Sequence, residues 1–441
     1  MRSLYLKIRK TWAGLSLTQK INALFLLYAC GLFPLLGGEY TGITLRKTLL
    51  ILIPSLLWAG ALLLAKEKPR LFPLGGVEWA LGGFWLWAGV AALCSPFGWS
   101  AFLGVGRSGG WLGLSFFLLL WWLGRAWGKG YPKLWLTALA GSLLLMNGVG
   151  ICQLLGFNPL GLYPPGVGYQ DGDILYRGTF LTTIGNTGQL SAFYCLAFPL
   201  LLFSWPKERT PLRYLWLLAI LSTLPILYLA KLDAAWLGLG LGLPLVFALS
   251  RKEKKIRWLS LAVYGLLLCG GLLWLWQYSG ENVTLQEASF LLHGQWDPSF
   301  GSQRLGVWAN TWQMIQERPW LGFGPDCFAL AYADHFPGGA NWDAAHNEYL
   351  GYWCDLGLPG LLAYVSALLL SFVTFLRRQQ TAGAAMLLCY GLQGLFSFPT
   401  FLVAPLFWLF GGILWGESAE RGENFLVSHE KAWYSKIEAR E

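Results

Sequence analysis

The residues best suited to chemistry in this chain lie in the polar stretch 301–360. It holds two of the four histidines, His335 and His346, and two arginines, Arg304 and Arg318. A neutral imidazole titrates near pH ~6.5 and can take a proton from a hydroxyl group. A guanidinium binds phosphate oxygens through a planar fork of N–H donors and keeps its charge. His346 is therefore either a general base or, as a lone histidine often is, a structural residue.

The segment 302–320 has the pattern of a short helix. Ser302 can cap its start, and Pro319 should stop it. Four residues share one face because their spacings are four, four and three: Arg304, Trp308, Trp312 and Ile315. This face is either an aromatic anchor at the membrane surface with a snorkelling arginine, or a device that aims Arg304 at a lipid phosphate.

Further candidates lie in other polar loops. Arg107 is in the glycine-rich loop GVGRSGGW, where the backbone could approach an anion, and Arg177 precedes a long apolar run. Asp171 and Asp173 form a DxD pair, a pattern that can hold a divalent cation against a diphosphate. The alternative is that these two are solvated loop acids.

Long apolar runs separate the polar stretches. Hydrophobic residues make up 55% of the 441-residue chain and charged residues 12%, against about 25% charged residues in soluble domains. Runs of about 20 apolar residues recur and lack β-barrel alternation. We expect an all-α integral membrane protein with about 12 transmembrane helices. The expected spans lie near 21–38, 48–65, 74–94, 111–127, 134–154, 188–205, 213–230, 234–249, 257–276, 357–376, 382–397 and 400–416.

Positive charge predicts the orientation of these spans. With the N-terminus in the cytoplasm, 25 of the 32 Lys and Arg residues fall in cytoplasmic segments, as the positive-inside rule expects. The net charge of +9 then reflects topology, which argues against a nucleic-acid partner. Seven fall outside: Arg46, Lys47, Arg107, Arg177, Lys231, Arg304 and Arg318. Arg46 and Lys47 sit at the mouth of a span, where they can snorkel.

The predicted topology divides the chain into consecutive regions. They are a cytoplasmic basic tail (1–20), nine spans with an extracytoplasmic loop at 155–187 (21–276), an extracytoplasmic catalytic loop (277–356), three further spans (357–416) and a cytoplasmic tail (417–441). The eight cysteines are scattered, without metal-site spacing. Cys327 and Cys354 flank the polar loop, and a disulfide between them is left open.

Three stretches carry a family resemblance: GTFLTTIGNTGQLSAFYCLAFPL, RLGVW…ERPWLGFGPDCF and AHNEYLGYWCDLGLPG. Over roughly 175–375 the chain resembles the superfamily of O-antigen ligases and Wzy-type polymerases, which are polytopic bacterial membrane glycosyltransferases. One ligase pattern, Arg followed four residues later by Leu, is met by Arg177 but not by Arg304, which is followed there by Trp308. A second pattern is met in full by His346, Asn347, Gly357 and Gly360.

The resemblance implies a mechanism. Arg177 and Arg304, with Arg107 as a third candidate, would grip the diphosphate of an undecaprenyl-diphosphate-linked glycan donor and stabilise it as it leaves. His346 would take the proton from the acceptor hydroxyl, and attack from the opposite face would invert the anomeric carbon. No cofactor or metal is implied. The residues in supporting roles would be Asn347, Glu348, Gly357 and Gly360.

Two questions stay open at this point. Within the superfamily, a ligase passes a finished glycan to another glycan, lipid A core or a protein, whereas a polymerase joins repeat units; the sequence leans towards the ligase. A transporter or flippase of lipid-linked sugars is the rival from another class, although only Glu78 lies plausibly within a span. We expect a multi-pass protein of the cytoplasmic (inner) membrane, with both termini in the cytoplasm and an active site at the outer leaflet of the bilayer.

Overall fold

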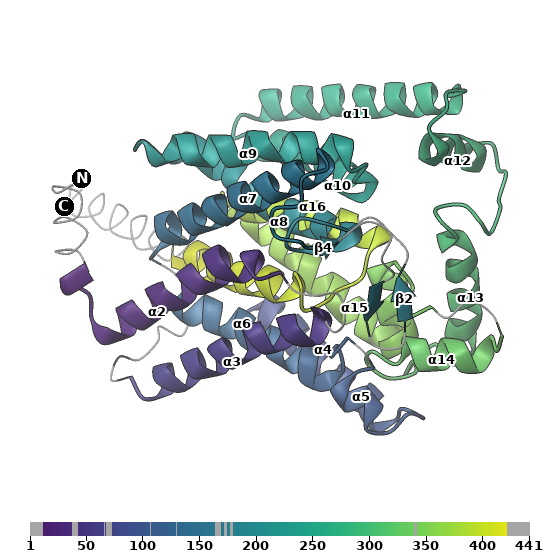
Figure 1. Ribbon diagram of the computed structural model, residues 1–441, viewed down its shortest axis with the longest axis horizontal. Helices are drawn as coiled ribbons and strands as arrows, with labels where there is room; N and C mark the ends of the chain where they lie inside the picture. Colours follow the sequence, from purple (N-terminus) through teal and green to yellow (C-terminus); the bar gives the residue numbers. More distant parts are fainter. Residues whose placement is uncertain are drawn as a thin grey trace, which may run out of the picture.

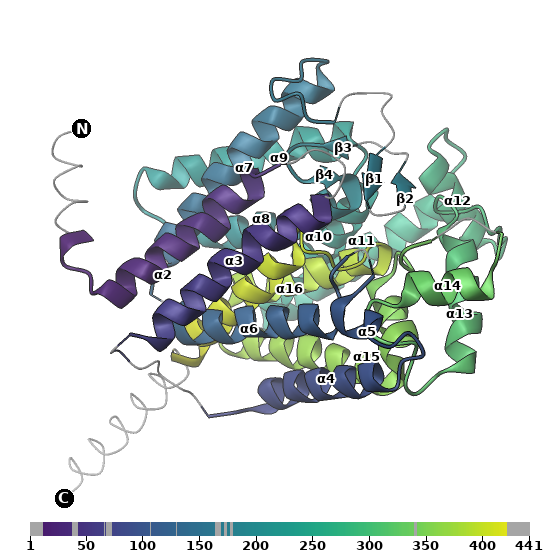
Figure 2. The same ribbon diagram turned by 60° about the horizontal axis from the view of Figure 1, so that its bottom comes forward.

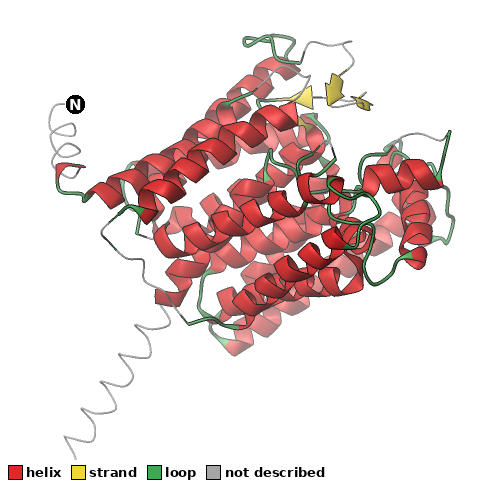
Figure 3. Cartoon of the chain, turned by 90° about the horizontal axis from the view of Figure 1, so that it is seen from below, coloured by secondary structure: helices red, strands yellow, loops and turns green. Residues whose placement is uncertain are grey.

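The structure is a computed structural model. It describes residues 12–37, 43–65, 67, 73–105, 107–128, 130–163, 169–171, 174–176, 180–338 and 342–420. Nearly all of the regular structure in these ranges is helical (Figure 3). The long helices lie side by side in a bundle, and the shorter elements gather at one of its ends (Figure 1).

Helices occupy every segment that the sequence marks as a span. They are α2 (Leu17–Leu27), which continues as a π-helical and a 3-10 turn to Leu35, α3 (Ile43–Leu63), α4 (Gly76–Leu93), α6 (Trp111–Trp127), α7 (Pro132–Leu154), α8 (Thr187–Ser204), α9 (Leu212–Leu229), α10 (Asp233–Leu249), α11 (Lys254–Trp276), α15 (Glu348–Arg377), α16 (Thr381–Gln393) and a helix over 404–420. Seven of these described helices are apolar and long enough to cross a membrane, and α6, α10 and α16 are shorter apolar helices. The chain is therefore a polytopic membrane protein.

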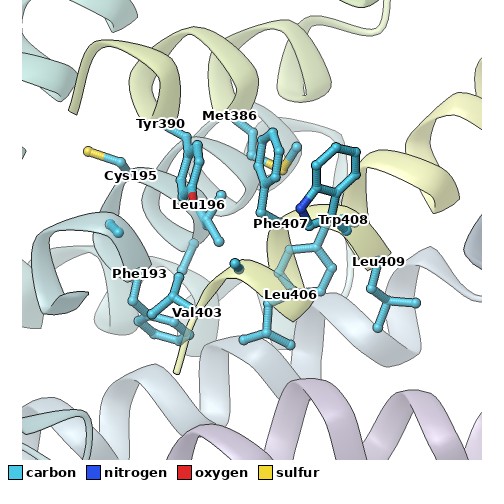
Figure 4. Packing of buried hydrophobic residues seen from close by; sticks show 14 of the residues in the cluster. Phe193, Cys195, Leu196, Met386, Tyr390, Val403, Leu406, Phe407, Trp408 and Leu409 are labelled. Atoms are coloured by element: carbon cyan, nitrogen blue, oxygen red, sulfur yellow. The ribbon is translucent and has the colours of Figure 1, made fainter. Parts of the chain in front are cut away.

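The centre of the bundle is formed by α8, α16 and the helix over 404–420. Figure 4 shows side chains of all three interleaving there. The rings of Tyr390 and Phe407 stack with their centroids 4.2 Å apart, and Phe193 and Val403 are fully buried beside them. By contrast α11 lies at the edge of the bundle and has no buried residue (Figure 1). Its apolar side chains suit contact with lipid on most sides.

Short elements at one end of the bundle complete the fold (Figure 2). The helices are α5 (Ser100–Leu103), α12 (Val283–Leu292), α13 (Arg304–Glu317) and α14 (Phe328–His335). The strands β1 (Tyr169–Asp171) and β2 (Ile174–Tyr176) pair antiparallel, as do β3 (Phe180–Leu181) and β4 (Gly185–Asn186). These two small sheets are a minor correction to the all-α expectation.

Polar contacts tie the segment 318–327 to this end of the bundle. Ser95 donates to the carbonyl of Phe323 at 2.5 Å, and Phe323 N–H donates to the carbonyl of Cys354 at 2.9 Å. Arg318 donates to the carbonyl of Cys94 at 3.1 Å. The end that contains residues 94–110, 298–347 and 394–403 is called the site end below.

Three details of the sequence interpretation need correction or completion. Lys47 does not snorkel: it is buried, and its ammonium donates to the carbonyl of Phe33 at 2.9 Å. Ser302 does not cap α13, because the residue before the helix is Gln303 and no side-chain cap bond forms. Cys327 and Cys354 are free, buried thiols. The stop before Pro319 is confirmed, since α13 ends at Glu317.

Candidate active site

His346 lies at the start of a long helix. It is the residue before Asn347, whose side chain caps α15 by accepting from the N–H groups of Tyr349 and Leu350, both at 3.1 Å. An Asn cap holds the first turn of a helix in register. His346 itself has a positive φ of 49°, which is uncommon for a residue with a Cβ. Asn347 therefore acts as a positioning residue for the imidazole.

Aromatic rings surround the His346 imidazole. Trp342 and Phe398 both meet it edge to face, with centroids 5.3 and 4.8 Å away. Among the described residues, no hydrogen bond of the imidazole is present. Neither of the nearby acids in sequence, Glu348 and Asp355, bonds to it. Glu348 instead accepts from Tyr364 at 2.5 Å. The ring nitrogens therefore have no hydrogen-bond partner in the described ranges.

Arg107 shares a neighbour with His346. Its guanidinium carbon lies 3.9 Å from the centre of the Phe398 ring, the same ring that the imidazole contacts. Arg107 also forms an ion pair with Asp343. Asp326 fixes the arginine's loop by accepting from the N–H groups of Val105 and Gly109, each at 3.0 Å. The third-choice arginine of the sequence interpretation is therefore close to the histidine.

Arg304 approaches the histidine from α13. One turn further along the helix, Trp308 donates its indole N–H to the carbonyl of Ala345 at 3.0 Å, which fixes α13 against the residue before His346. The backbone entering the helix is left-handed at Gly301, Ser302 and Gln303, with φ of 64°, 58° and 70°. Left-handed backbone at two non-glycine residues costs free energy and is found most often at functional sites.

The Arg304 guanidinium is partly buried, and the charge of Asp233 acts on it only through space. Within the part of the chain that the structure describes, it makes no ion pair or hydrogen bond. Burial lowers its pKa, and Asp233 opposes this shift only through space. A buried charge without a partner is unfavourable, so this position is suited to an anion that the chain does not itself supply.

The electrostatics of the three groups are coupled. Burial and then the positive charges of Arg304 and Arg107 lower the pKa of His346 to about 3. The imidazole is therefore neutral at physiological pH and can accept a proton. Two guanidiniums beside one neutral imidazole can bind a phosphate and activate a hydroxyl in the same place.

The two glycines of the sequence pattern have packing roles. Gly357 lies at a kink inside α15 with φ of 70°, and a Cβ there would collide with the carbonyl of Trp320. The N–H of Leu358 donates to the carbonyl of Pro319 at 2.8 Å across the same contact. A Cβ on Gly360 would lie 3.3 Å from the Trp87 ring. Glycine is needed here so that the turn after α13 can pack directly on α15.

Beside the histidine is a cavity that the sequence did not predict. It has a volume of about 60 Å³, and its lining includes Arg107, Asp326, Asn347, Glu348 and Asp355. His346 and Arg304 do not line it. The sequence signal for Asp326 was its place in the turn-rich GFGPDCF, which was interpreted only as a rigid spacer. Burial raises the pKa of Asp326 to about 6, against the opposing effect of its backbone hydrogen bonds and Arg107.

Three of the predicted residues remain outside this geometry. Arg177 and Asp173 lie outside the described residues. Asp171 is described only as the last residue of β1, opposite Ile174. In the described ranges, no group of three His, Cys, Asp or Glu residues is arranged to hold a metal ion.

Comparison with known protein families gives one match. The family model Wzy_C, described as O-antigen ligase, matches residues 218–365. This confirms the superfamily resemblance: the chain carries a domain found in O-antigen ligases and polymerases, the enzymes of surface polysaccharide assembly. The matched range includes Arg304 and His346 but not Arg107 or Arg177. No curated protein matches the chain.

Proposed function

We propose that this protein transfers a glycan from an undecaprenyl-diphosphate-linked donor to a sugar hydroxyl, in the manner of an O-antigen ligase. The observation that carries the proposal is a partly buried guanidinium, Arg304, without a direct ion pair among the described residues. It lies near a neutral imidazole that has no hydrogen bond there, in a domain of this family. A second guanidinium, Arg107, contacts Phe398, the ring that His346 also contacts.

The proposed reaction is a single displacement at the anomeric carbon. Arg304 and Arg107, with Arg177, bind the diphosphate of the donor through their N–H forks. The acceptor oxygen forms a bond to the anomeric carbon while the bond to the diphosphate oxygen breaks, and that electron pair stays on the diphosphate. His346 receives the hydroxyl proton. The guanidiniums stabilise the charge that grows on the leaving group.

Donor binding also prepares the base. The two guanidiniums contribute to the depressed pKa of His346 in the empty site. A bound diphosphate brings negative charge and opposes their effect, so the pKa of the imidazole rises when the donor is in place. His346 therefore becomes a stronger base at the stage of the reaction in which a base is needed.

The proposed topology follows from the arrangement of the loops. The site end contains the described residues of 94–110, 298–347 and 394–403. The lysine- and arginine-rich connections are elsewhere: 205–211 joins α8 to α9, and 250–253 joins α10 to α11. We assign the site end to the outer face of the cytoplasmic membrane, with about 12 crossings and both termini inside. A cysteine in place of the exposed Trp320, in a Cys94→Ala background, should react with an impermeant thiol reagent in intact spheroplasts. Reaction only after lysis would reverse the assignment.

The activity is tested by turnover of the purified full chain in nanodiscs. The substrates are an undecaprenyl-diphosphate oligosaccharide from the source cell and its candidate acceptors, with and without EDTA. Release of undecaprenyl diphosphate that survives EDTA and is lost in His346→Ala supports the proposal, and the size ladder of the product separates ligase from polymerase. Lipid-linked sugar that moves between leaflets without turnover would instead support a transporter.

A further inference from the structure

A groove at the site end lies outside the residues discussed so far. It has a volume of about 730 Å³ and is open along one side of α13 and α14. Its lining combines aromatic and amide side chains: Gln303, Asn310, Tyr332, His335, Phe336 and Trp342. Ligand-binding grooves commonly have this mixture of flat apolar surface and a few polar groups.

The groove adjoins the candidate base through one shared neighbour, although His346 itself does not line the groove. Trp342 lines it and also contacts the His346 ring edge to face at 5.3 Å. The His346 ring also contacts Phe398, and the Arg107 guanidinium lies against the same Phe398 ring. Gln303, at the near end of the groove, is the residue before Arg304. The contacts therefore run from the groove to the imidazole and then to a phosphate-binding arginine.

The chemistry of the lining indicates the kind of occupant. No Asp, Glu, Lys or Arg is among the residues that line the groove in the described part of the chain. Asn310 donates to the Tyr332 hydroxyl at 2.7 Å, so both side chains are held in place with acceptor oxygens remaining. Aromatic rings pack against the C–H faces of sugars, and amides and hydroxyls bond to sugar hydroxyls. A lipid tail would leave these polar groups without partners.

We infer that this groove binds the glycan of the acceptor, as a short stretch of uncharged sugar residues, and presents its terminal hydroxyl to His346. The inference rests on the proposed function, since it assigns the side of the base from which the acceptor arrives. In an inverting displacement the acceptor and the diphosphate lie on opposite faces of the anomeric carbon. The groove meets His346 through Trp342, whereas Arg107 meets it through Phe398, and we assign these two contacts to the acceptor and the diphosphate.

Phe336 and Asn310 offer the cleanest variants because neither contacts His346. Phe336→Leu keeps an apolar side chain but removes the flat ring, and Asn310→Ala removes the amide. Each should raise KM for the acceptor by about two- to tenfold, the scale of one aromatic or hydrogen-bond contact. KM for the lipid-linked donor and kcat should stay unchanged. Trp312→Ala is the matched control, because Trp312 is exposed on α13 and does not line the groove.

Binding without turnover separates this inference from the proposed function. The probe is a lipid-free oligosaccharide released from the cell-surface glycan of the source cell, observed by saturation-transfer NMR with the full chain in nanodiscs. We expect equal signal in the wild type and in Arg304→Lys, and a weaker signal in Phe336→Leu and Asn310→Ala, with the melting temperature of each variant measured to verify folding. Binding of the oligosaccharide with no turnover would contradict the proposed activity but support the groove as a glycan-binding site. Equal acceptor KM and equal NMR signal in wild type and in both folded groove variants, or displacement of the oligosaccharide by short-chain lipid, would overturn the inference.

Discussion

Two arginines at different ends of the helix bundle, Arg125 and Arg304, show how differently the fold treats charge. At the end away from the site, Arg125 pairs with Glu78 at 3.1 Å, and Glu78 also accepts from the Trp415 indole at 2.7 Å and from Gly75 N–H at 2.9 Å. At the site end, Arg304 has no ion pair or hydrogen bond with any described residue and faces a neutral histidine. The first arrangement satisfies its charges within the chain, and the second does not.

The difference indicates which charge serves the fold and which serves a ligand. Removing one partner of a buried pair leaves the other uncompensated, so Arg125 and Glu78 stabilise the native packing of α4, α6 and the helix over 404–420. Arg304 receives no such compensation, and the backbone before it is left-handed at two non-glycine residues. Strained backbone is found most often at functional sites. We propose that the function of Arg304 and of the strained residues before it is donor binding.

The largest expected effect is on the base. His346→Ala should lower turnover by ~10²–10⁴, the usual contribution of a positioned general base. Its melting temperature should stay close to that of the wild type, because the imidazole makes no hydrogen bond within the described residues. If His346→Ala unfolds or turns over normally, His346 is a structural residue, and the distinction between charges that serve the fold and groups that serve a ligand fails.

Arg125→Met is expected to act on stability instead. It removes the ion-pair partner of the buried Glu78 carboxylate and should lower the free energy of unfolding by about 3–5 kcal/mol. The double variant Arg125→Met, Glu78→Gln should recover part of this loss, as measured by thermal denaturation in detergent. Arg304→Met should leave the melting temperature unchanged or raise it, since it removes an uncompensated charge. Equal destabilisation by Arg125→Met and Arg304→Met would contradict the distinction.

Arg304→Lys tests whether the planar set of guanidinium N–H donors is needed, rather than positive charge alone. Lysine keeps the charge but offers a compact ammonium in place of the planar guanidinium. We expect kcat/KM for the donor to fall about ten- to hundredfold, the scale of a charged hydrogen bond. Arg318→Lys is a suitable control, because Arg318 bonds a backbone carbonyl at the edge of the site end rather than the histidine. Similar losses in both variants would point to a structural role.

The pH dependence should reveal the coupling between donor and base. The folded pKa of His346 is about 3, below the unfolded value of ~6.5. The stabilisation that comes from burying the neutral imidazole is therefore full above ~6.5 and is lost as the pH falls towards 3. Because kcat/KM reports the empty enzyme, its acid limb from His346 should lie at lower pH than that of kcat. Coincident limbs in the two profiles would contradict the effect of the diphosphate.

The smallest effect is expected at the DxD pair. Exchange of Asp171 and Asp173 for Asn should change turnover by less than about twofold, as for solvated surface residues. EDTA should have no effect on either protein. Loss of turnover in the variant together with sensitivity to EDTA would make these residues metal ligands and would require a metal in the account of the site.

The sequence predicted the helices and the histidine better than the neighbours of the histidine. Apolar length alone located the spans, but α15 begins at Glu348, nine residues before the expected start at 357. Phe398, which joins Arg107 to His346, could not be predicted because an aromatic residue in an apolar run has no distinguishing signal. Asn347 and Glu348 were both expected near the chemistry, but hydrogen bonds assign the first to a helix cap and the second to Tyr364. Such assignments depend on tertiary contacts rather than on spacing.

The most direct test of the account is the effect of undecaprenyl diphosphate on the melting temperature of the full chain in nanodiscs. A ligand that binds only the folded state raises this temperature in proportion to its affinity. We predict a rise for the wild type and for Arg318→Lys, and little or none for Arg304→Met. An equal rise in Arg304→Met and the wild type would contradict the claim that the unpaired guanidinium binds the donor diphosphate.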